Sequence, residues 1–110
     1  MNDVEAKLSE LKEIAVSQLN KCGVSEIDHA QLDGYVNSLK TMVDNHDASL
    51  VAAQDPSELE TVRRNFVEKK LGITDKDKAM AAITKVAETM SEFKNKNRPA
   101  FYYLVAKELG

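Results

Sequence analysis

The helix signal that decides the fold class is the stretch DPSELETVRRNFVEKKLG, residues 55–72. Asp55 can cap free backbone N–H groups, and Pro56 suits the first helical position. Gly72 ends the stretch, because glycine readily adopts the left-handed conformation that closes many helices. Ile73 is then placed to fold back onto the helix in a Schellman-type contact. The sequence therefore predicts one continuous helix between these two signals.

Two further helices are predicted on the N-terminal side. The first covers about residues 3–22, where six apolar residues fall within an arc of about 80° at helical spacing. Gly23 ends it in the same way as Gly72 ends the later helix. The second begins at Asp28, and Gln31 stands three residues later in the reciprocal position of a capping box.

Residues 44–54 interrupt the helical pattern. The apolar segment at 50–53 suits either a helical turn or extended chain, and both remain open. Asp44, His46 and Asp47 are residue types that bind metals, but they are adjacent loop residues without a diagnostic spacing. Turn chemistry explains the polar residues equally well. We expect neither a metal site nor a cofactor.

Two more helices follow residue 72. Thr74 can cap the fourth, with Asp77 in the reciprocal role, and its apolar face extends over residues 79–93. Pro99 opens the fifth. No strand-like alternation with hairpin signals is present. We therefore predict an all-α fold, a compact single-domain bundle of about five helices that covers residues 1–110.

Composition limits the cellular setting. The chain has 110 residues and a single cysteine, Cys22, so it cannot form an internal disulfide. Cys22 lies on the apolar face of the first predicted helix, where a thiol behaves as a small hydrophobic group. No apolar run approaches the roughly 20 residues of a membrane span. The acidic N-terminus lacks the features of a secretion signal. We expect a soluble, cytoplasmic protein without membrane contact.

The two halves of the chain differ in charge. Residues 1–60 carry twelve Asp and Glu against four Lys, whereas residues 61–110 carry six against eleven Lys and Arg. The balances are −8 and +5. The halves could attract each other within one fold, or the basic half could face an anionic partner. The first interpretation is the simpler one.

Basic side chains interrupt the apolar arc of the helix predicted over 56–71. At 100° per residue, Arg63 and Lys70 fall between two groups of apolar positions. Buried cations need partners or a route to water. The simpler interpretation gives them a carboxylate partner, and Glu108 on the last helix is the first candidate. The alternative is a patch for an anionic group or a partner, formed by Arg63, Lys69, Lys70 and Arg98.

From residue 47 onward the chain resembles a family of small bacterial proteins that is catalogued as a domain of unknown function. The resemblance rests on several motifs in a fixed order, and residues 1–46 match only loosely. The motifs are Asp47–Ala52, Asp55–Leu59, Val62-Arg63, Phe66, Lys69–Gly72, Lys96–Arg98 and Phe101–Leu104. The resemblance implies a bacterial origin and an all-helical fold. It implies no activity, cofactor or catalytic residue.

Catalytic signatures are missing from the sequence. It contains no glycine-rich phosphate loop, nucleophile elbow or zinc-binding helix motif. Our leading hypothesis is a non-enzymatic module that binds a protein partner or itself. The alternatives are a binder of an anionic small molecule or nucleic acid through the basic half, and an enzyme whose site assembles from distant residues. Tyr102 and Tyr103 could stack on bases, but nucleic-acid binding is not expected of an acidic chain.

Overall fold

The computed structural model describes residues 3–39 and 50–110, and its helices confirm the predicted all-α fold class. Five α-helices, one π-helical segment and two very short strands lie in the described part of the chain. Their order is α1 (Asp3–Lys21), α2 (His29–Asn37), β1 (Leu50–Val51), α3 (Pro56–Val62), η3 (Arg63–Glu68), α4 (Lys76–Thr89), β2 (Lys96–Asn97) and α5 (Arg98–Leu109).

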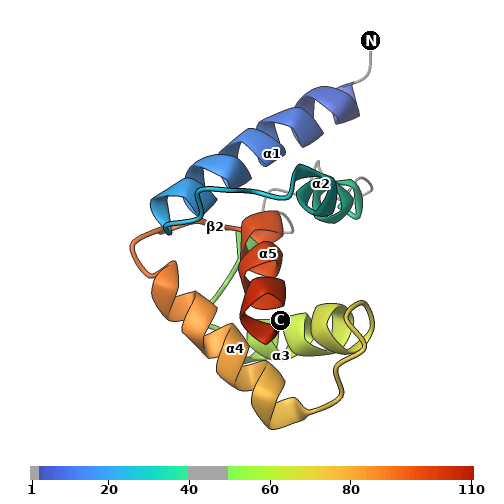
Figure 1. Ribbon diagram of the computed structural model, residues 1–110, viewed down its shortest axis with the longest axis vertical. Helices are drawn as coiled ribbons and strands as arrows, with labels where there is room; N and C mark the ends of the chain where they lie inside the picture. Colours follow the sequence, from blue (N-terminus) through green and yellow to red (C-terminus); the bar gives the residue numbers. More distant parts are fainter. Residues whose placement is uncertain (1–2, 40–49) are drawn as a thin grey trace.

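Helix α5 lies at the centre of the bundle. Figure 1 shows α1 across one end of it and α2, α3 and α4 around its sides. Every residue from Pro99 to Val105 is buried, so α5 has no solvent face over nearly two turns. A helix that is apolar on all sides belongs in a core. Helices α1, α2 and α4 therefore pack against the last helix, while α1 also contacts α2, and α3 contacts α4.

The predicted apolar faces form one hydrophobic cluster that includes residues of every helix. Most of the predicted positions on α1, α2 and α4 that the structure describes are buried, as far as Leu39 on the second helix, whereas Cys22, Tyr35, Ala87 and Phe93 are only partly buried. The predicted face of the second helix continued to Val43, and that part lies outside the described residues. The largest fully buried side chains are Phe66, Phe101, Leu19, Leu32, Ile83 and Met90.

Most predicted helix ends are confirmed. Asp28 accepts a hydrogen bond from the Gln31 N–H at 3.1 Å, as a helix cap does. Gly23 and Gly72 have φ angles of +92° and +71°, the left-handed region that a side chain would strain. The Ile73 N–H folds back onto the Val67 carbonyl at 3.1 Å.

Two capping predictions are wrong in detail. The Gln31 side chain does not return to the Asp28 N–H but donates to the Tyr35 hydroxyl at 2.8 Å. The Asp28 N–H instead donates to the hydroxyl of Tyr103 on α5, at 2.9 Å. Helix α4 is capped by Asp75 and not by Thr74. In each case a tertiary contact or a neighbouring carboxylate replaces the partner that local spacing indicated.

The continuous helix predicted between Pro56 and Leu71 is also wrong, because it changes to π-helical geometry at Arg63. A π-helix forms i→i+5 hydrogen bonds, so its turns are wider and each residue rotates through less than 100°. Val62, Phe66 and Val67 thereby share one buried side. The Arg63 side chain is itself only 12% exposed, and Glu60 and Glu68 neutralise its charge.

The strands were not predicted. Leu50 pairs with Asn97 and Val51 with Lys96, in antiparallel register. Residues 50 and 51 are therefore extended chain, which settles the open choice at this segment. The polar residues considered as metal ligands, at 44–47, lie outside the described part of the chain.

A buried polar junction ties α1 to the start of α5. The Asn97 side chain is fully buried. Its amide donates to the Leu11 carbonyl at 3.1 Å, and its oxygen caps α5 by accepting from the Ala100 N–H at 2.9 Å. The Asn97 N–H donates to the Gln18 side chain at 2.9 Å. Gln18 in turn donates to the Asn95 carbonyl at 2.9 Å. Each polar group of this α1–α5 junction has a partner.

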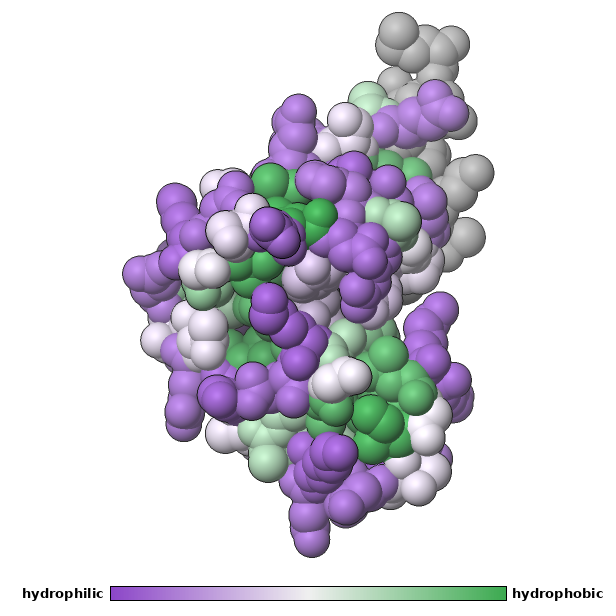
Figure 2. Space-filling model, in the orientation of Figure 1, coloured by the Kyte–Doolittle hydropathy of each residue, from purple (hydrophilic) through white to green (hydrophobic). Residues whose placement is uncertain are grey.

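Hydrophilic residues cover most of the face shown in Figure 2, with patches of apolar surface in its lower half, where α3, α4 and α5 meet. Among the described residues, none of the helices combines the length and apolar content that a membrane span requires. The molecule extends over 44 × 28 × 26 Å.

Candidate functional site

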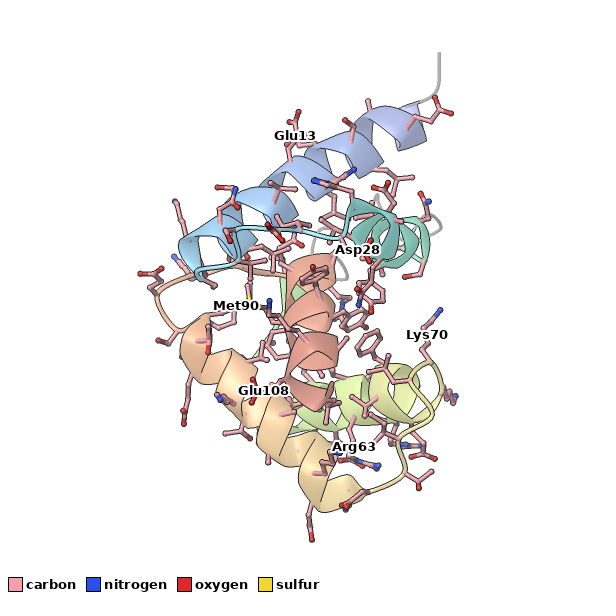
Figure 3. The ribbon with its side chains drawn as sticks, in the orientation of Figure 1. Glu13, Asp28, Arg63, Lys70, Met90 and Glu108 are labelled. Atoms are coloured by element: carbon pink, nitrogen blue, oxygen red, sulfur yellow. The ribbon has the colours of Figure 1, made fainter. Side chains whose placement is uncertain are left out.

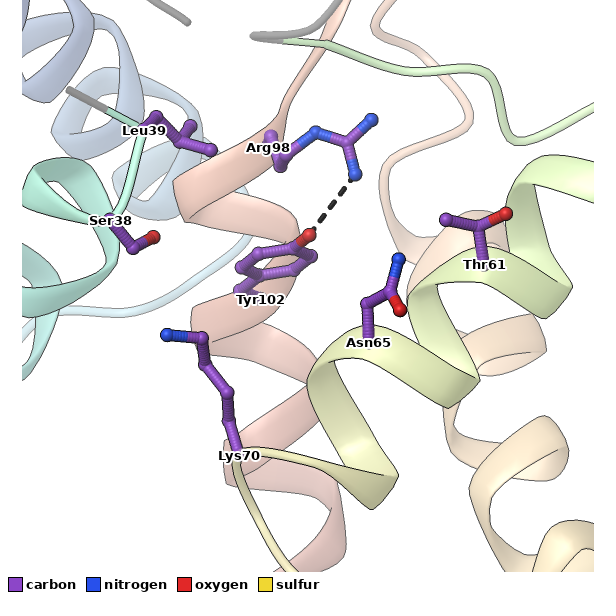
Figure 4. Close-up of a pocket in the computed structure, with 7 residues that line it drawn as sticks. All are labelled: Ser38, Leu39, Thr61, Asn65, Lys70, Arg98 and Tyr102. Atoms are coloured by element: carbon purple, nitrogen blue, oxygen red, sulfur yellow. Dashed lines mark hydrogen bonds between the residues drawn. The ribbon is translucent and has the colours of Figure 1, made fainter. Parts of the chain in front are cut away.

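A pocket lies between the end of α2, the α3–η3 segment and the start of α5. Its volume is about 300 Å³. Figure 4 shows seven side chains around it, contributed by three separate parts of the sequence. They are Ser38, Leu39, Thr61, Asn65, Lys70, Arg98 and Tyr102. Two of the four residues predicted to form an anion or partner patch, Lys70 and Arg98, are therefore brought together here.

Arg98 is held firmly at one edge of this pocket. It is the first residue of α5, and its guanidinium donates to the Leu50 carbonyl at 2.8 Å and to the Tyr102 hydroxyl at 3.1 Å. It also forms an ion pair with Glu58. Burial alone would lower the pKa of Arg98, but Tyr102 and Glu58 outweigh it and raise that pKa. Arg98 stays charged, and Glu58 offsets its unfavourable place at a helix N-terminus.

Lys70 lies across the pocket from Arg98, in the turn that follows η3 (Figure 4). Its N–H donates to the Phe66 carbonyl at 2.9 Å, which fixes the backbone at this point. The Lys70 side chain is exposed, and no carboxylate among the described residues pairs with it. Lys70 is therefore a pocket cation whose charge is not neutralised by that part of the protein.

Three aromatic rings support the pocket from inside. Tyr102 stacks on Phe66 with ring centroids 4.1 Å apart, and Tyr35 meets both rings edge-on. Such pairs add stability beyond the area that they bury. Tyr102 and Tyr103 are 9% and 6% exposed, so both belong to the core and neither presents a ring face for stacking on bases.

Three smaller polar side chains complete the lining. The Ser38 hydroxyl donates to the Tyr35 carbonyl at 2.6 Å, and the Thr61 hydroxyl donates to the Ser57 carbonyl at 2.9 Å. Both hydroxyl oxygens can still accept a hydrogen bond. The Asn65 amide has no hydrogen-bond partner in the described part of the chain. The pocket thus offers positive charge, one amide and several hydroxyl groups.

The other two predicted patch residues lie elsewhere. Figure 3 shows Arg63 beside α4 and Lys70 at the far end of the same segment. The Arg63 guanidinium bonds to Glu60 at 3.0 Å and to Glu68 at 3.2 Å. These bonds, led by the one to Glu60, raise the pKa of Arg63. Lys69 is exposed and does not line the pocket.

Glu108 is not the partner of either cation. It pairs with Lys85 of α4 at 2.9 Å, so the predicted link from α5 to Arg63 or Lys70 is wrong. The carboxylates that bind Arg63 come from its own helical segment. The expectation that Arg63 pairs with a carboxylate is confirmed, although its partner was misassigned.

A second cavity, also of about 300 Å³, adjoins Cys22. This thiol lies 3.9 Å from the Thr89 carbonyl, and burial followed by the charge of Glu92 raises its pKa. A raised pKa lowers the thiolate fraction, which fits the predicted structural role of the cysteine. Among the described residues, no three His, Cys, Asp or Glu side chains are grouped to hold a metal ion.

Sequence reasoning missed Ser38, Thr61 and Asn65. Nothing in their local spacing marks them, because they converge only when α2 and α3 pack on α5. Tyr102 was assigned to the core, and the structure adds that its hydroxyl contributes to the pocket. The one available signal was the pair of cations that interrupts the apolar arc near Arg63 and Lys70.

The comparisons with known proteins place the chain in a family. No curated protein matches it at a significant level. The family model described as "Protein of unknown function (DUF2853)" matches residues 14–110, a range that contains every residue lining the Lys70–Arg98 pocket. It also extends well before residue 47, where the resemblance of motifs began. The chain therefore belongs to the DUF2853 family, whose function is unknown.

Proposed function

We propose that this protein is a binding protein that holds a small anionic ligand in the Lys70–Arg98 pocket. The observation that carries the proposal is the exposed ammonium group of Lys70 in a concave site, which no carboxylate of residues 3–39 and 50–110 neutralises. Binding sites commonly combine an apolar lining with a few convergent polar groups. This develops the alternative in which the basic half binds an anion. The hypothesis of a protein-partner module has no comparable single feature to support it.

The geometry supplies what an anion needs. Lys70 offers a point charge with three donors, and the Asn65 amide and Tyr102 hydroxyl offer further donors. Arg98 adds positive potential while it remains bound to Glu58. Hydrogen bonds in which one partner is charged are about twice as strong as neutral ones. A carboxylate or phosphate group at this site would gain such bonds.

The proposal is tested by titrating ¹⁵N-labelled protein with acetate and with inorganic phosphate at constant ionic strength. We expect saturable shifts of the backbone amide signals of Asn65, Lys70 and Tyr102. The Lys70→Gln variant should lose them. The Lys69→Gln variant is the matched control, since Lys69 is a neighbouring exposed lysine outside the pocket. Shifts spread equally over the exposed lysines would show ordinary screening and contradict the proposal.

We also propose a cellular setting for the protein. We place the protein in the bacterial cytoplasm, because the chain carries one cysteine and the resemblance of its motifs is to bacterial proteins. Fractionation of a native host that expresses the protein at its own level would test this placement.

A further inference from the structure

We infer that the ligand of the Lys70–Arg98 pocket is a monocarboxylic acid with a short apolar body. This inference rests on the proposed anion-binding function and specifies the chemical class of the ligand. It follows from three properties of the pocket: its charge balance, the nature of its wall and its size.

The charge balance favours a single negative charge. The pocket is lined by two cations, but Arg98 already forms an ion pair with Glu58. Only Lys70 lacks a carboxylate partner among the described residues. One unneutralised cation matches a carboxylate, which carries one negative charge at neutral pH. A phosphate monoester carries about −1.5 to −2 and would leave part of its charge unmatched.

The wall of the pocket is largely apolar despite its polar groups. Leu39 is buried and contributes its side chain, and Tyr102 contributes its ring. The carbon stems of Lys70 and Arg98 add further apolar surface beneath their charged ends. A bare inorganic ion would leave this surface in contact with water. A ligand with a hydrocarbon portion beside its carboxylate would cover it.

The size of the cavity limits that hydrocarbon portion. At about 300 Å³, it lies at the lower end of the range for ligand pockets. The Lys70 ammonium, the Asn65 amide and the Tyr102 hydroxyl line this cavity as donors for the carboxylate. We therefore expect a short aliphatic or single-ring acid rather than a long-chain fatty acid.

The test compares dissociation constants for acetate, butanoate, hexanoate, butyl phosphate and inorganic phosphate, measured by NMR titration of the full chain. Affinity should rise about two- to fourfold per added methylene from acetate to butanoate, as apolar surface is buried. Butanoate should bind at least as tightly as butyl phosphate. The increase should stop once the chain outgrows the pocket.

Three substitutions at exposed positions sharpen the result. Lys70→Gln should weaken butanoate binding about tenfold, because a charge-assisted bond is lost, whereas Lys69→Gln should change it less than about twofold. Asn65→Asp should weaken it about fivefold by repulsion. All three side chains are exposed, so each variant is expected to fold.

Failure of the inference and failure of the proposed function look different. If acetate, butanoate and inorganic phosphate bind with equal dissociation constants, the site binds anions, but the inference that its ligand has an apolar portion is wrong. If butyl phosphate binds more than about tenfold tighter than butanoate, the carboxylate assignment is wrong. If no anion produces saturable, Lys70-dependent shifts, the anion-binding function itself fails, and the inference fails with it.

Discussion

The α1–α5 junction and the Lys70–Arg98 pocket are both polar regions at the start of α5, but they satisfy their polar groups in opposite ways. At the junction, Asn97 and Gln18 are buried and each side-chain group has a partner within the protein. At the pocket, Lys70 and Asn65 are exposed and lack such partners among the described residues. A buried group without a partner is costly, whereas a solvated one can be kept available for a ligand. The first region therefore stabilises the fold, and the second can serve binding.

The comparison predicts its largest effect for Asn97→Ala. This change removes the cap of α5 and the bond to the Leu11 carbonyl, and it leaves a small cavity. We expect a loss of about 2–4 kcal/mol in the free energy of unfolding. Urea denaturation followed by circular dichroism would measure this loss. The Asn97→Ser variant should retain part of the lost stability, because the serine hydroxyl can still cap the helix. Asn95→Ala, at an exposed position, is the control and should stay within about 0.5 kcal/mol.

Gln18→Ala tests the same junction from the α1 side. It leaves the buried Asn97 N–H without an acceptor, so we expect a loss of about 1–3 kcal/mol. Ser17→Ala on the exposed face of α1 is the matched control. Equal stabilities of the Gln18 and Ser17 variants would mean that water replaces the Gln18 side chain at no cost. The conclusion that the junction, unlike the pocket, stabilises the fold would then be wrong.

Arg63→Ala should have a smaller effect that depends on pH and salt. The hydrogen bond from Arg63 lowers the pKa of Glu60 in the folded protein. A lowered pKa stabilises the folded state above the pKa of an unfolded glutamate, about 4.3, and this contribution is lost as pH falls through the lower folded value. The difference in Tm between wild type and variant should therefore narrow below about pH 4 and at high salt. A difference in Tm that depends on neither pH nor salt would indicate that Arg63 stabilises the fold through packing rather than through its charge.

Lys70→Gln should have the smallest effect on folding. Its side chain is exposed and unpaired in the described structure, so the free energy of unfolding should change by less than about 0.5 kcal/mol. The same variant should lose anion binding. Measuring stability and ligand affinity on one sample would separate the two roles. A large loss of stability would show that Lys70, like Asn97, stabilises the fold.

Features fixed by local chemistry were predictable from the sequence. The caps at Asp28 and Asp55 and the helix-ending glycines at 23 and 72 depend only on neighbouring residues, and they are confirmed. The π-helical segment was not predictable, because an apolar pattern was read at a fixed 100° per residue. Val62, Phe66 and Val67 are buried together, and Phe66 stacks on Tyr102 of α5, which is tertiary information.

The candidate site was predictable only in part. Lys70 and Arg98 were selected by sequence, but Arg63 shares their charge and local pattern while facing Glu60 and Glu68 instead. No separate role was predicted for Asn97, yet it forms the centre of the buried junction. Its partner Leu11 is 86 positions away in sequence. Contacts at such separation leave no trace in local spacing, so neither region could be assigned its role from sequence alone.

The central position of α5 has a consequence for how the protein is made. Helices α1, α2 and α4 each pack against α5, which is the last helix of the described chain to be synthesised. Translation adds about 5–20 residues per second, so the earlier helices wait several seconds for the surface that buries their apolar sides. During that time the nascent chain presents unpacked amphipathic segments to the cell. The helices can therefore complete their common core only after α5 has left the ribosome.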